Sequence, residues 1–429
     1  MKTLYKSKWL LPGNRKVIEN GGFLVENGVI CDIFTAEQLG NIDLSACDTV
    51  DFGNATITPG FINTHAHLQY TEIGKKRSKS LVNRLRRLIL ELRKQLIFKG
   101  QNKTFTSWIV DLIIEYMSLS EKERIDSFNS GLRQALSGGT TAIAQLSREE
   151  VYFDILNSSP INAYIFFEVY ADSEESSEKN FDDFRKKYER LLPKCSKNTF
   201  IGISPHAPYN IHRHLWEKIA EYSRQNDVLI HTHFAEAAEE MKWLATGHSD
   251  IDKLHKFAMF KHIEPDKKES SAIEYLKTLN LPYNNVILAH VCQLAQEDYK
   301  TLGELGVAVA HCPRSNIKLH GRTLNLPAIL EHLSGRVGLG TDSLYSNDDL
   351  NMLNEARLAL NAGVDLLTVL DMLTIDTARI LKIDHLTGSI EKGKQADFLV
   401  FKPDNNLDYS AFANCEKPDN VFIAGKQLI

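Results

Sequence analysis

Short apolar runs that end in a polar residue and alternate with helix-like stretches are the feature that most constrains the fold of this chain. Runs of strand length are expected at residues 57–64, 140–145, 162–169, 200–205, 228–233, 286–290, 307–311 and 336–341. Helix-like stretches, such as Asp126 to Leu136 and Tyr345 to Leu360, separate them. Eight alternating strand–helix units over about 330 residues predict an α/β fold, a TIM-like (β/α)8 barrel.

Both ends of the chain add short strand-like segments. Residues 21–33 predict a hairpin around an Asn27-Gly28 turn, and residues 396–426 contain two more strand-like runs. Each end is too small to build a hydrophobic core alone, so we expect the two ends to pack together. The expected domains are a composite β-sandwich, from residues 1–56 and 388–429, and a metal-dependent catalytic barrel, from residues 57–387.

Polar side chains that bind metals follow several of the expected strands. His65 and His67 end the first run, and alternate residues of a strand point the same way, so the two imidazoles form half of a metal site. His233, His290 and Asp342 stand at the ends of later strands. In a parallel barrel these ends share one face, where catalytic residues gather. A helix N-cap is the alternative role for Asp342.

This set of donors suits one divalent transition ion, with zinc preferred and iron as the alternative. His65, His67 and His233 would be neutral imidazole ligands and Asp342 the fourth ligand. A metal with an open coordination position lowers the pKa of bound water to about 7, which makes hydroxide available at neutral pH.

Further polar residues near the strand ends are candidates for proton transfer and substrate binding. Glu236 follows His233 by three residues and could turn back over the site to move a proton, although a surface glutamate is the alternative. Its neighbours Glu239 and Glu240 are expected to be solvated. His290 would hydrogen-bond the attacking water or the new oxyanion, or else bind a second metal. His206 is assigned to substrate binding, with a loop-structuring role as the alternative.

The order of His65, His67, His233, His290 and Asp342 resembles the amidohydrolase superfamily over nearly the whole chain. Binuclear members of that superfamily carry a bridging lysine or carboxylate at the fourth strand. Here that strand ends at His206, so the resemblance implies a single metal. Residues 311–316 are expected to shape the pocket through a fixed turn.

Several sequence blocks narrow the resemblance to the deaminase and chlorohydrolase branch, whose members displace a group on an electron-poor ring with water. The blocks lie at residues 59–67, 204–209, 233–236, 311–316 and 340–343. They imply a hydrolase of C–N bonds other than peptide bonds, acting on a cyclic amidine. A non-catalytic binding protein would be expected to have lost a ligand or Glu236, and neither is lost.

The segment before Trp108 guides the choice of substrate within this branch. Adenosylhomocysteine deaminases carry a glutamate just before a tryptophan, whereas this chain has Phe105-Thr-Ser-Trp108. The chain is more similar here to aminodeoxyfutalosine deaminases of the alternative menaquinone pathway. The favoured substrate is therefore a 6-aminopurine nucleoside, aminodeoxyfutalosine, bound by His206, Glu236 and Trp108. The alternatives are deamination of S-adenosylhomocysteine, methylthioadenosine or guanine, and triazine hydrolysis.

Composition excludes other classes of protein and partner. A net charge of −5 gives no basic surface for nucleic acid, and no apolar run approaches the roughly 18 residues of a membrane span. The six cysteines include no Cys-x-x-Cys pair, and the N-terminus lacks a signal-peptide core, so a reduced, cytoplasmic setting is expected. The partner would be a small-molecule substrate, and a homodimer is left open. Residues 248–271 form either a lid or a surface elaboration.

Overall fold

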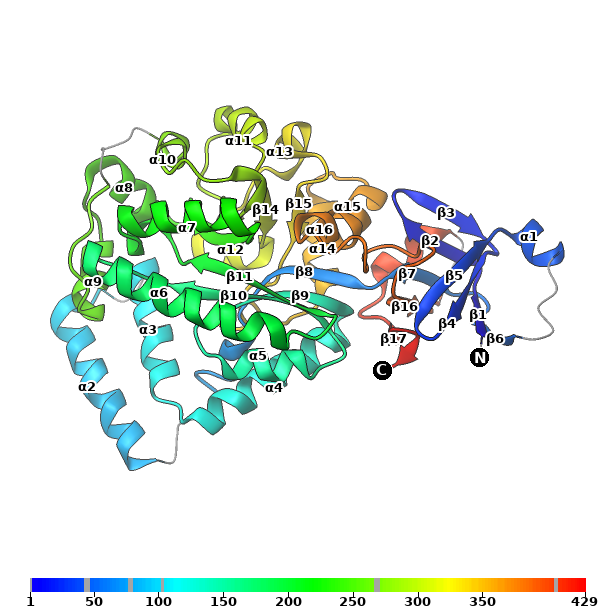
Figure 1. The fold of residues 1–429 in the computed structure, drawn as a ribbon, viewed down its shortest axis with the longest axis horizontal. Helices are drawn as coiled ribbons and strands as arrows, with labels where there is room; N and C mark the ends of the chain where they lie inside the picture. Colours follow the sequence, from blue (N-terminus) through cyan, green and yellow to red (C-terminus); the bar gives the residue numbers. More distant parts are fainter. Residues whose placement is uncertain (1, 42–46, 76–79, 102–103, 266–270, 405–407) are drawn as a thin grey trace.

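The fold combines a parallel barrel with a smaller β domain built from both chain ends (Figure 1). The computed structural model describes residues 2–41, 47–75, 80–101, 104–265, 271–404 and 408–429. Both ends of the chain lie in the β domain (Figure 1). Among these residues, no helix is long and apolar enough to cross a membrane.

The barrel sheet has eight parallel strands in chain order, so the TIM-like fold expected from the sequence is confirmed. The strands are β8 (Phe61–Ala66), β9 (Thr140–Ser147), β10 (Asn162–Val169), β11 (Thr199–Pro205), β12 (Ile230–Phe234), β13 (Val286–His290), β14 (Ala308–His311) and β15 (Val337–Leu339). A parallel bridge between Ala66 and Asp342 joins the first strand to the segment after the last. The backbone N–H of Asp342 donates to the carbonyl of His65 at 3.0 Å, so barrel closure itself brings two candidate ligands together.

Helices lie outside the barrel strands and at one of the barrel's ends (Figure 1). The α-helices are α1 (Ala36–Asn41), α2 (Leu81–Phe98), α3 (Phe105–Met117), α4 (Glu121–Ser137), α5 (Val151–Asn157), α6 (Glu174–Leu191), α7 (Arg213–Asn226), α8 (Ala238–Thr246), α9 (Ile251–Ala258), α10 (Ala272–Thr278), α11 (Tyr299–Leu305), α12 (Pro313–His320), α13 (Leu326–Leu333), α14 (Met352–Asn361), α15 (Leu366–Leu373) and α16 (Ile375–Ile380). Short 3-10 helices are η1 (Leu68–Tyr70), η2 (Leu192–Lys194), η3 (Pro208–Asn210), η4 (Tyr283–Asn285), η5 (Gln296–Asp298) and η6 (Tyr409–Asn414).

The β domain consists of two sheets that draw strands from both ends of the chain. One sheet has the order β5-β4-β1-β6 and the other β18-β17-β16-β7-β2-β3. Their strands are β1 (Lys2–Lys6), β2 (Trp9–Gly13), β3 (Lys16–Glu19), β4 (Gly22–Glu26), β5 (Val29–Phe34), β6 (Asp48–Asp51), β7 (Thr56–Pro59), β16 (Phe398–Phe401), β17 (Asn420–Ile423) and β18 (Lys426–Gln427). The predicted hairpin is present as β4 and β5, with Asn27 and Gly28 both at positive φ.

The hydrophobic core of the β domain joins residues that are nearly 400 positions apart in the sequence. Tyr5 and Phe23 pack against Phe398, and Phe398 stacks on Phe422 with ring centroids 4.3 Å apart. Buried Asp397 accepts hydrogen bonds from the Asn162 side chain of the barrel at 2.7 Å and from the backbone N–H of Ala424. The composite β domain expected from the sequence is thus observed, while its exact limits stay a prediction.

The first predicted strand, residues 57–64, is in fact two strands. It breaks at Gly60: β7 pairs with β16 in the β domain, and β8 begins the barrel. A Cβ at Gly60 would lie 2.0 Å from the Thr141 hydroxyl oxygen, so the close approach of the neighbouring strand requires glycine here. The apolar run from Ile57 to Ile62 crosses the break, which explains why the sequence suggested one strand.

The helix expected over residues 345–360 begins later than predicted. It is α14, which starts at Met352 after the Asn351 side chain caps the backbone N–H of Leu353. The preceding residues form turns, because Ser343 and Ser346 hydrogen-bond each other and Ser346 bonds Asp342. Short polar side chains that bond nearby backbone and side-chain groups compete with helix formation.

Candidate metal centre and active site

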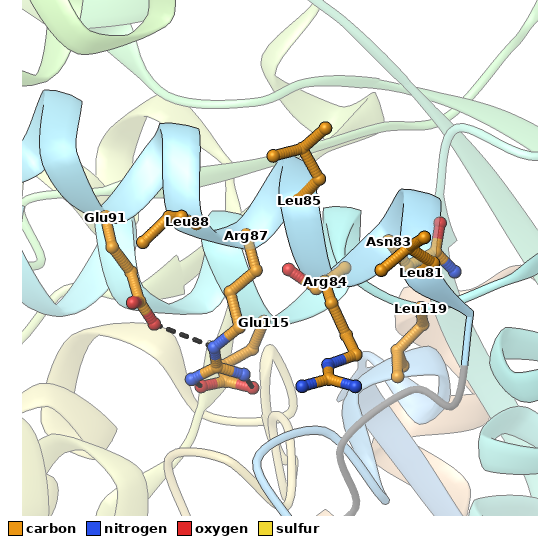
Figure 2. A pocket seen from close by; sticks show the side chains of 10 residues that line it. Leu81, Asn83, Arg84, Leu85, Arg87, Leu88, Glu91, Glu115 and Leu119 are labelled. Atoms are coloured by element: carbon orange, nitrogen blue, oxygen red, sulfur yellow. Dashed lines mark hydrogen bonds and ion pairs between the residues drawn. The ribbon is translucent and has the colours of Figure 1, made fainter.

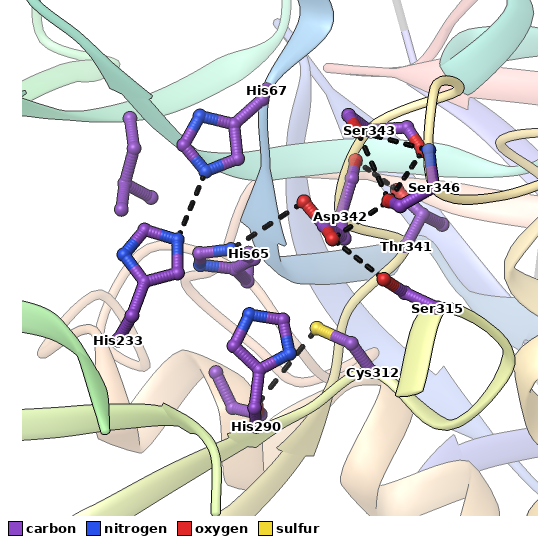
Figure 3. A network of polar contacts seen from close by, with 12 residues as sticks. His65, His67, His233, His290, Cys312, Ser315, Thr341, Asp342, Ser343 and Ser346 are labelled. Carbon is purple, nitrogen blue, oxygen red and sulfur yellow. Dashed lines mark hydrogen bonds and ion pairs between the residues drawn. The ribbon is translucent and has the colours of Figure 1, made fainter. Parts of the chain in front are cut away.

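Three histidines meet at the end of the barrel where the strands finish (Figure 3). One ring nitrogen from each of His65, His67 and His233 lies within 4.8 Å of the others. The Nε2 atoms of His67 and His233 are 3.3 Å apart. Within the described chain, both ring nitrogens of fully buried His65 lack a hydrogen-bond partner. A buried imidazole nitrogen without a partner is costly, and a bound cation would satisfy the nitrogen of His65 that faces it.

The electrostatics of the cluster keep these imidazoles neutral. Burial, followed by the neighbouring imidazoles, lowers the pKa of His65 and of His67 well below the usual value. Burial also lowers the pKa of His233. The Nδ1 of His233 lies 2.8 Å from the carbonyl of His206 and can donate to it, which leaves Nε2 to face the cluster. A backbone acceptor of this kind fixes the tautomer that metal ligation needs.

Asp342 reaches the cluster with one carboxylate oxygen and is anchored by the other (Figure 3). Its Oδ2 accepts hydrogen bonds from the hydroxyls of Ser315 at 2.6 Å and Ser346 at 2.7 Å. Its Oδ1 lies 3.8 Å from Nε2 of His65. The residue has a left-handed φ of 56°, which is unusual for a non-glycine residue. The two serines and the strand bridge therefore hold a strained aspartate towards the histidines.

Glu236 and His290 face the same space from adjacent strand ends. The Glu236 Oε1 atom lies 3.8 Å from Nε2 of His290 and 3.4 Å from Nε2 of His320. Burial alone would raise the pKa of Glu236, but His290, His320 and His233 outweigh it and hold the pKa below the usual value. The Nδ1 of His290 lies 2.8 Å from the Asn316 side-chain oxygen, and its Nε2, which faces the site, has no hydrogen-bond partner among the described residues.

Glu240 corrects one expectation from the sequence, because it is buried rather than solvated. Its carboxylate accepts the backbone N–H groups of Ala235 at 3.0 Å and Glu236 at 2.9 Å. Burial raises the pKa of Glu240 to about 8. Through these two hydrogen bonds, the Glu240 carboxylate holds the turn that carries Glu236. Glu239 is half-exposed and accepts the backbone N–H of Phe105.

Aromatic and polar residues surround a small cavity next to the histidine cluster. It has a volume of about 60 Å³ and contacts the candidate substrate residues His206, Glu236 and Trp108. His206 packs on His233 with ring centroids 4.8 Å apart, and Trp108 comes from α3 together with Phe105. The structure therefore brings every candidate residue of the sequence analysis to one place.

Comparison with known proteins adds to this geometry. The model of the amidohydrolase family matches residues 56–428. The chain belongs to the amidohydrolase family. A curated relative, the 5-methylthioadenosine/S-adenosylhomocysteine deaminase of Bacillus cereus (strain G9842), is 25% identical over 456 aligned positions, covering 100% of this chain and 94% of the relative.

Solved structures with the same fold align with this amidohydrolase over the whole chain or nearly all of it. The aminofutalosine deaminase of Helicobacter pylori has a TM-score of 0.79 at 21% identity, with both chains fully covered. An adenosine deaminase from Xanthomonas campestris with bound zinc has a TM-score of 0.72 at 22% identity, covering 99% of this chain and 92% of that chain. At these identities the similarity establishes the fold.

Some residues of the site were not identified from the sequence. Glu168, at the end of β10, lines the cavity, and burial raises its pKa to about 7. His320 ends α12 and contacts both Glu236 and the ring of Phe105. Position at a strand end could have identified Glu168. No local signal marks His320, because it lies at the C-terminus of α12, nine residues beyond the end of β14.

A larger cavity of this amidohydrolase, about 390 Å³, lies along α2 and α3 (Figure 2). Its lining combines leucines with polar and charged residues. Arg87 donates two hydrogen bonds to the carboxylate of Glu115, one of them at 2.7 Å. None of the histidines of the cluster reaches it. Size alone therefore does not mark the active site, and the smaller cavity beside the histidines carries the chemistry.

Proposed function

We propose that this protein is a single-metal hydrolytic deaminase that converts a 6-aminopurine nucleoside to the 6-oxo nucleoside and ammonia. The observation that carries the proposal is the meeting of three histidines with Asp342, Glu236 and His290 beside one cavity. The full-length relation to a curated deaminase of adenosine derivatives supports the substrate class.

In this proposal His65, His67, His233 and Asp342 hold one divalent ion. The unpartnered nitrogens of His65 and the imidazole–carboxylate donor set fit zinc, with iron as the alternative. When bound, such an ion acts as a Lewis acid that makes water a nucleophile at neutral pH. Elemental analysis of the purified protein would identify the ion.

The remaining steps use groups of the chain itself. Water adds its oxygen to C6 of the purine, and Asp342 Oδ1, which faces the cluster, accepts the proton that water loses. Glu236 takes up the other proton of that water and gives it to N1, and the C6–N1 double bond becomes single. His290 accepts a hydrogen bond from the attacking water through its unpaired Nε2. Asp342 then passes its proton to the amino nitrogen, the bond between C6 and the amino nitrogen breaks, and ammonia leaves as the 6-oxo group forms.

The size of the cavity implies that α3 moves when substrate enters. Sites for ligands of drug size usually measure roughly 300–1,000 Å³, whereas this cavity measures about 60 Å³. Phe105 and Trp108 of α3 cover it, and the ring of Phe105 lies 5.0 Å from that of His320. We infer that α3 opens to admit the nucleoside and that Trp108 and His206 then contact it.

The choice among nucleosides gives a direct prediction. No acid precedes Trp108, so the usual acceptor for a ribose hydroxyl is missing and a bulky 5′ substituent should be tolerated. Aminodeoxyfutalosine should therefore exceed S-adenosylhomocysteine in kcat/KM when ammonia release is measured with one preparation. A clear preference for S-adenosylhomocysteine, methylthioadenosine, guanine or a triazine would reject the narrow substrate while leaving metal-dependent hydrolysis intact.

The outer face of α2 supports a homodimer, which we propose as the assembly state. Large apolar side chains are exposed there at the a and d spacing of a coiled coil: Val82 67%, Leu85 57%, Ile89 57%, Leu92 51% and Leu96 79%. The wild-type protein should sediment as a dimer, and a Leu85→Glu/Leu92→Glu protein as a monomer. A monomeric wild type would contradict this proposal. The matched control is Arg84→Glu, on the same helix but outside the apolar stripe.

We further propose a cytoplasmic location and the division into residues 57–387 and 1–56 with 388–429. All six cysteines are free thiols, which suits a reducing compartment. The six-stranded sheet, which contains strands from both ends, supports the domain division.

A further inference from the structure

A second group of metal-binding residue types lies outside the active site, in the segment that follows α8. We call it the distal cluster, and it consists of His248, Asp252, His255, His262 and Glu264. One ligand atom from each of His248, His262 and Glu264 lies within 4.8 Å of the others, and the same holds for Asp252, His255 and His262. His262 belongs to both groups and lies at their centre.

The exposed half of the distal cluster is a ring of imidazoles and carboxylates. Asp252 meets Nδ1 of His248 at 3.1 Å and Nδ1 of His262 at 3.0 Å. Glu264 meets Nε2 of the same two histidines at 3.7 Å and 3.5 Å. The two imidazoles stack with centroids 4.7 Å apart and planes at 11°.

One carboxylate oxygen of this ring lacks a hydrogen-bond partner. The Oδ1 atom of Asp252 is buried and makes no hydrogen bond within the described residues, although Nδ1 of His262 lies 3.0 Å away. A divalent cation held between the imidazoles and the carboxylates would give this oxygen a partner, and the carboxylates would balance the charge of the ion.

The buried half of the cluster supplies an independent observation. His255 is only 3% exposed, and its Nε2 lies 2.7 Å from the backbone carbonyl of Tyr209, to which it can donate. Its Nδ1 has no hydrogen-bond partner within the described part of the chain. An imidazole that donates one N–H to a carbonyl and keeps the other nitrogen free is the usual arrangement of a metal-ligating histidine.

We propose that the distal cluster is a second, separate metal site that takes a divalent transition ion, with zinc as the best-suited ion. His255, His262 and Asp252 form its core, and His248 with Glu264 completes the coordination. Three imidazoles favour zinc over calcium or magnesium, which prefer sites made only of oxygen ligands.

The position of the distal cluster would let a bound ion act indirectly on the active site, through the residues that connect the two. Tyr209, whose carbonyl receives the His255 bond, also lines the cavity. The cluster's own helix α9 packs against α3, which carries Phe105 and Trp108 (Figure 1). Arg93 of α2 donates to the carbonyl of Lys256 on α9 at 2.9 Å. Ion binding would therefore hold α9 in place. Since α3 packs against α9, the proposed movement of α3 would take place along a fixed surface.

Zinc content of the full-length protein tests the proposal. After equilibration with zinc and removal of free metal, the wild type should hold about two ions per chain, and His262→Ala and Asp252→Asn about one each. The His67→Ala protein should also keep about one, and His67→Ala/His262→Ala none. The matched control is His332→Ala, an exposed histidine on α13, which should keep both ions.

Thermal unfolding separates the two sites without reference to activity. Added zinc should raise the unfolding temperature of His67→Ala, since an ion that binds only the folded state stabilises it, and should leave His67→Ala/His262→Ala unchanged. A wild type that holds one ion, or a His262→Ala protein that holds as many as the wild type, would overturn the proposal.

Discussion

The Asp342→Ala protein is expected to lose both the active-site metal and the deaminase activity. The substitution removes a carboxylate next to the histidine cluster, with Oδ1 3.8 Å from Nε2 of His65. His67→Ala should have the same effect, because its Nε2 lies 3.3 Å from that of His233. Elemental analysis and ammonia release, measured on the same samples, should fall together. Full metal content with normal turnover in Asp342→Ala would reject the assigned ligand set.

Two further variants separate ligand loss from general damage to the fold. Asp342 also accepts the buried hydroxyls of Ser315 and Ser346, and leaving a buried polar group unpaired costs about 1–3 kcal/mol. Asp342→Asn keeps an acceptor for these hydroxyls but removes the charge, so it should fold normally and still lose metal and turnover. Asp348→Ala changes a nearby aspartate with a side chain 75% exposed and should retain both.

The Glu236→Gln protein should keep its metal and its fold but turn over about 10²–10⁴-fold more slowly, the usual scale for a lost proton-transfer group. The amide preserves the shape of the side chain and its contact with His320, but it cannot pass a proton to N1. The measurement is kcat with the best nucleoside, together with metal content. A loss of less than about tenfold would mean that another group carries the proton.

A matched substitution nearby controls for effects on the turn. Glu239→Gln changes a half-exposed glutamate three residues further on, whose oxygen accepts the backbone N–H of Phe105. Glutamine can still accept that bond, so turnover should stay close to that of the wild type. If Glu239→Gln slowed the reaction as much as Glu236→Gln, the turn rather than the proton transfer would be responsible.

The sequence predicted the parts of the site that depend on strand geometry. His65, His233 and His290 end buried strands of a parallel sheet, and such ends converge whatever the details of packing. The barrel and the composite β domain were predicted from the same pattern, in which apolar runs of strand length recur along the chain. These predictions needed no knowledge of which residues touch.

The predictions that were wrong depend on contacts that the residue pattern does not show, some of them local and some between segments that are distant in the sequence. Glu240 looks solvated among its charged neighbours, yet the turn that carries Glu236 buries it beneath two backbone N–H groups. The break at Gly60 follows from the Thr141 side chain of the next strand.

The sequence by itself determined which residue types stand at the ends of the strands, and hence the candidate metal ligands and the resemblance to the family. Only the tertiary structure decided how these residues are held and what else joins them. Ser315 anchors Asp342, His320 reaches Glu236 from the end of a helix, and His255 connects the distal cluster to the active-site wall. The physical reason is that strand alternation is a local property of the backbone, whereas burial, pKa and hydrogen-bond partners depend on segments brought together by packing.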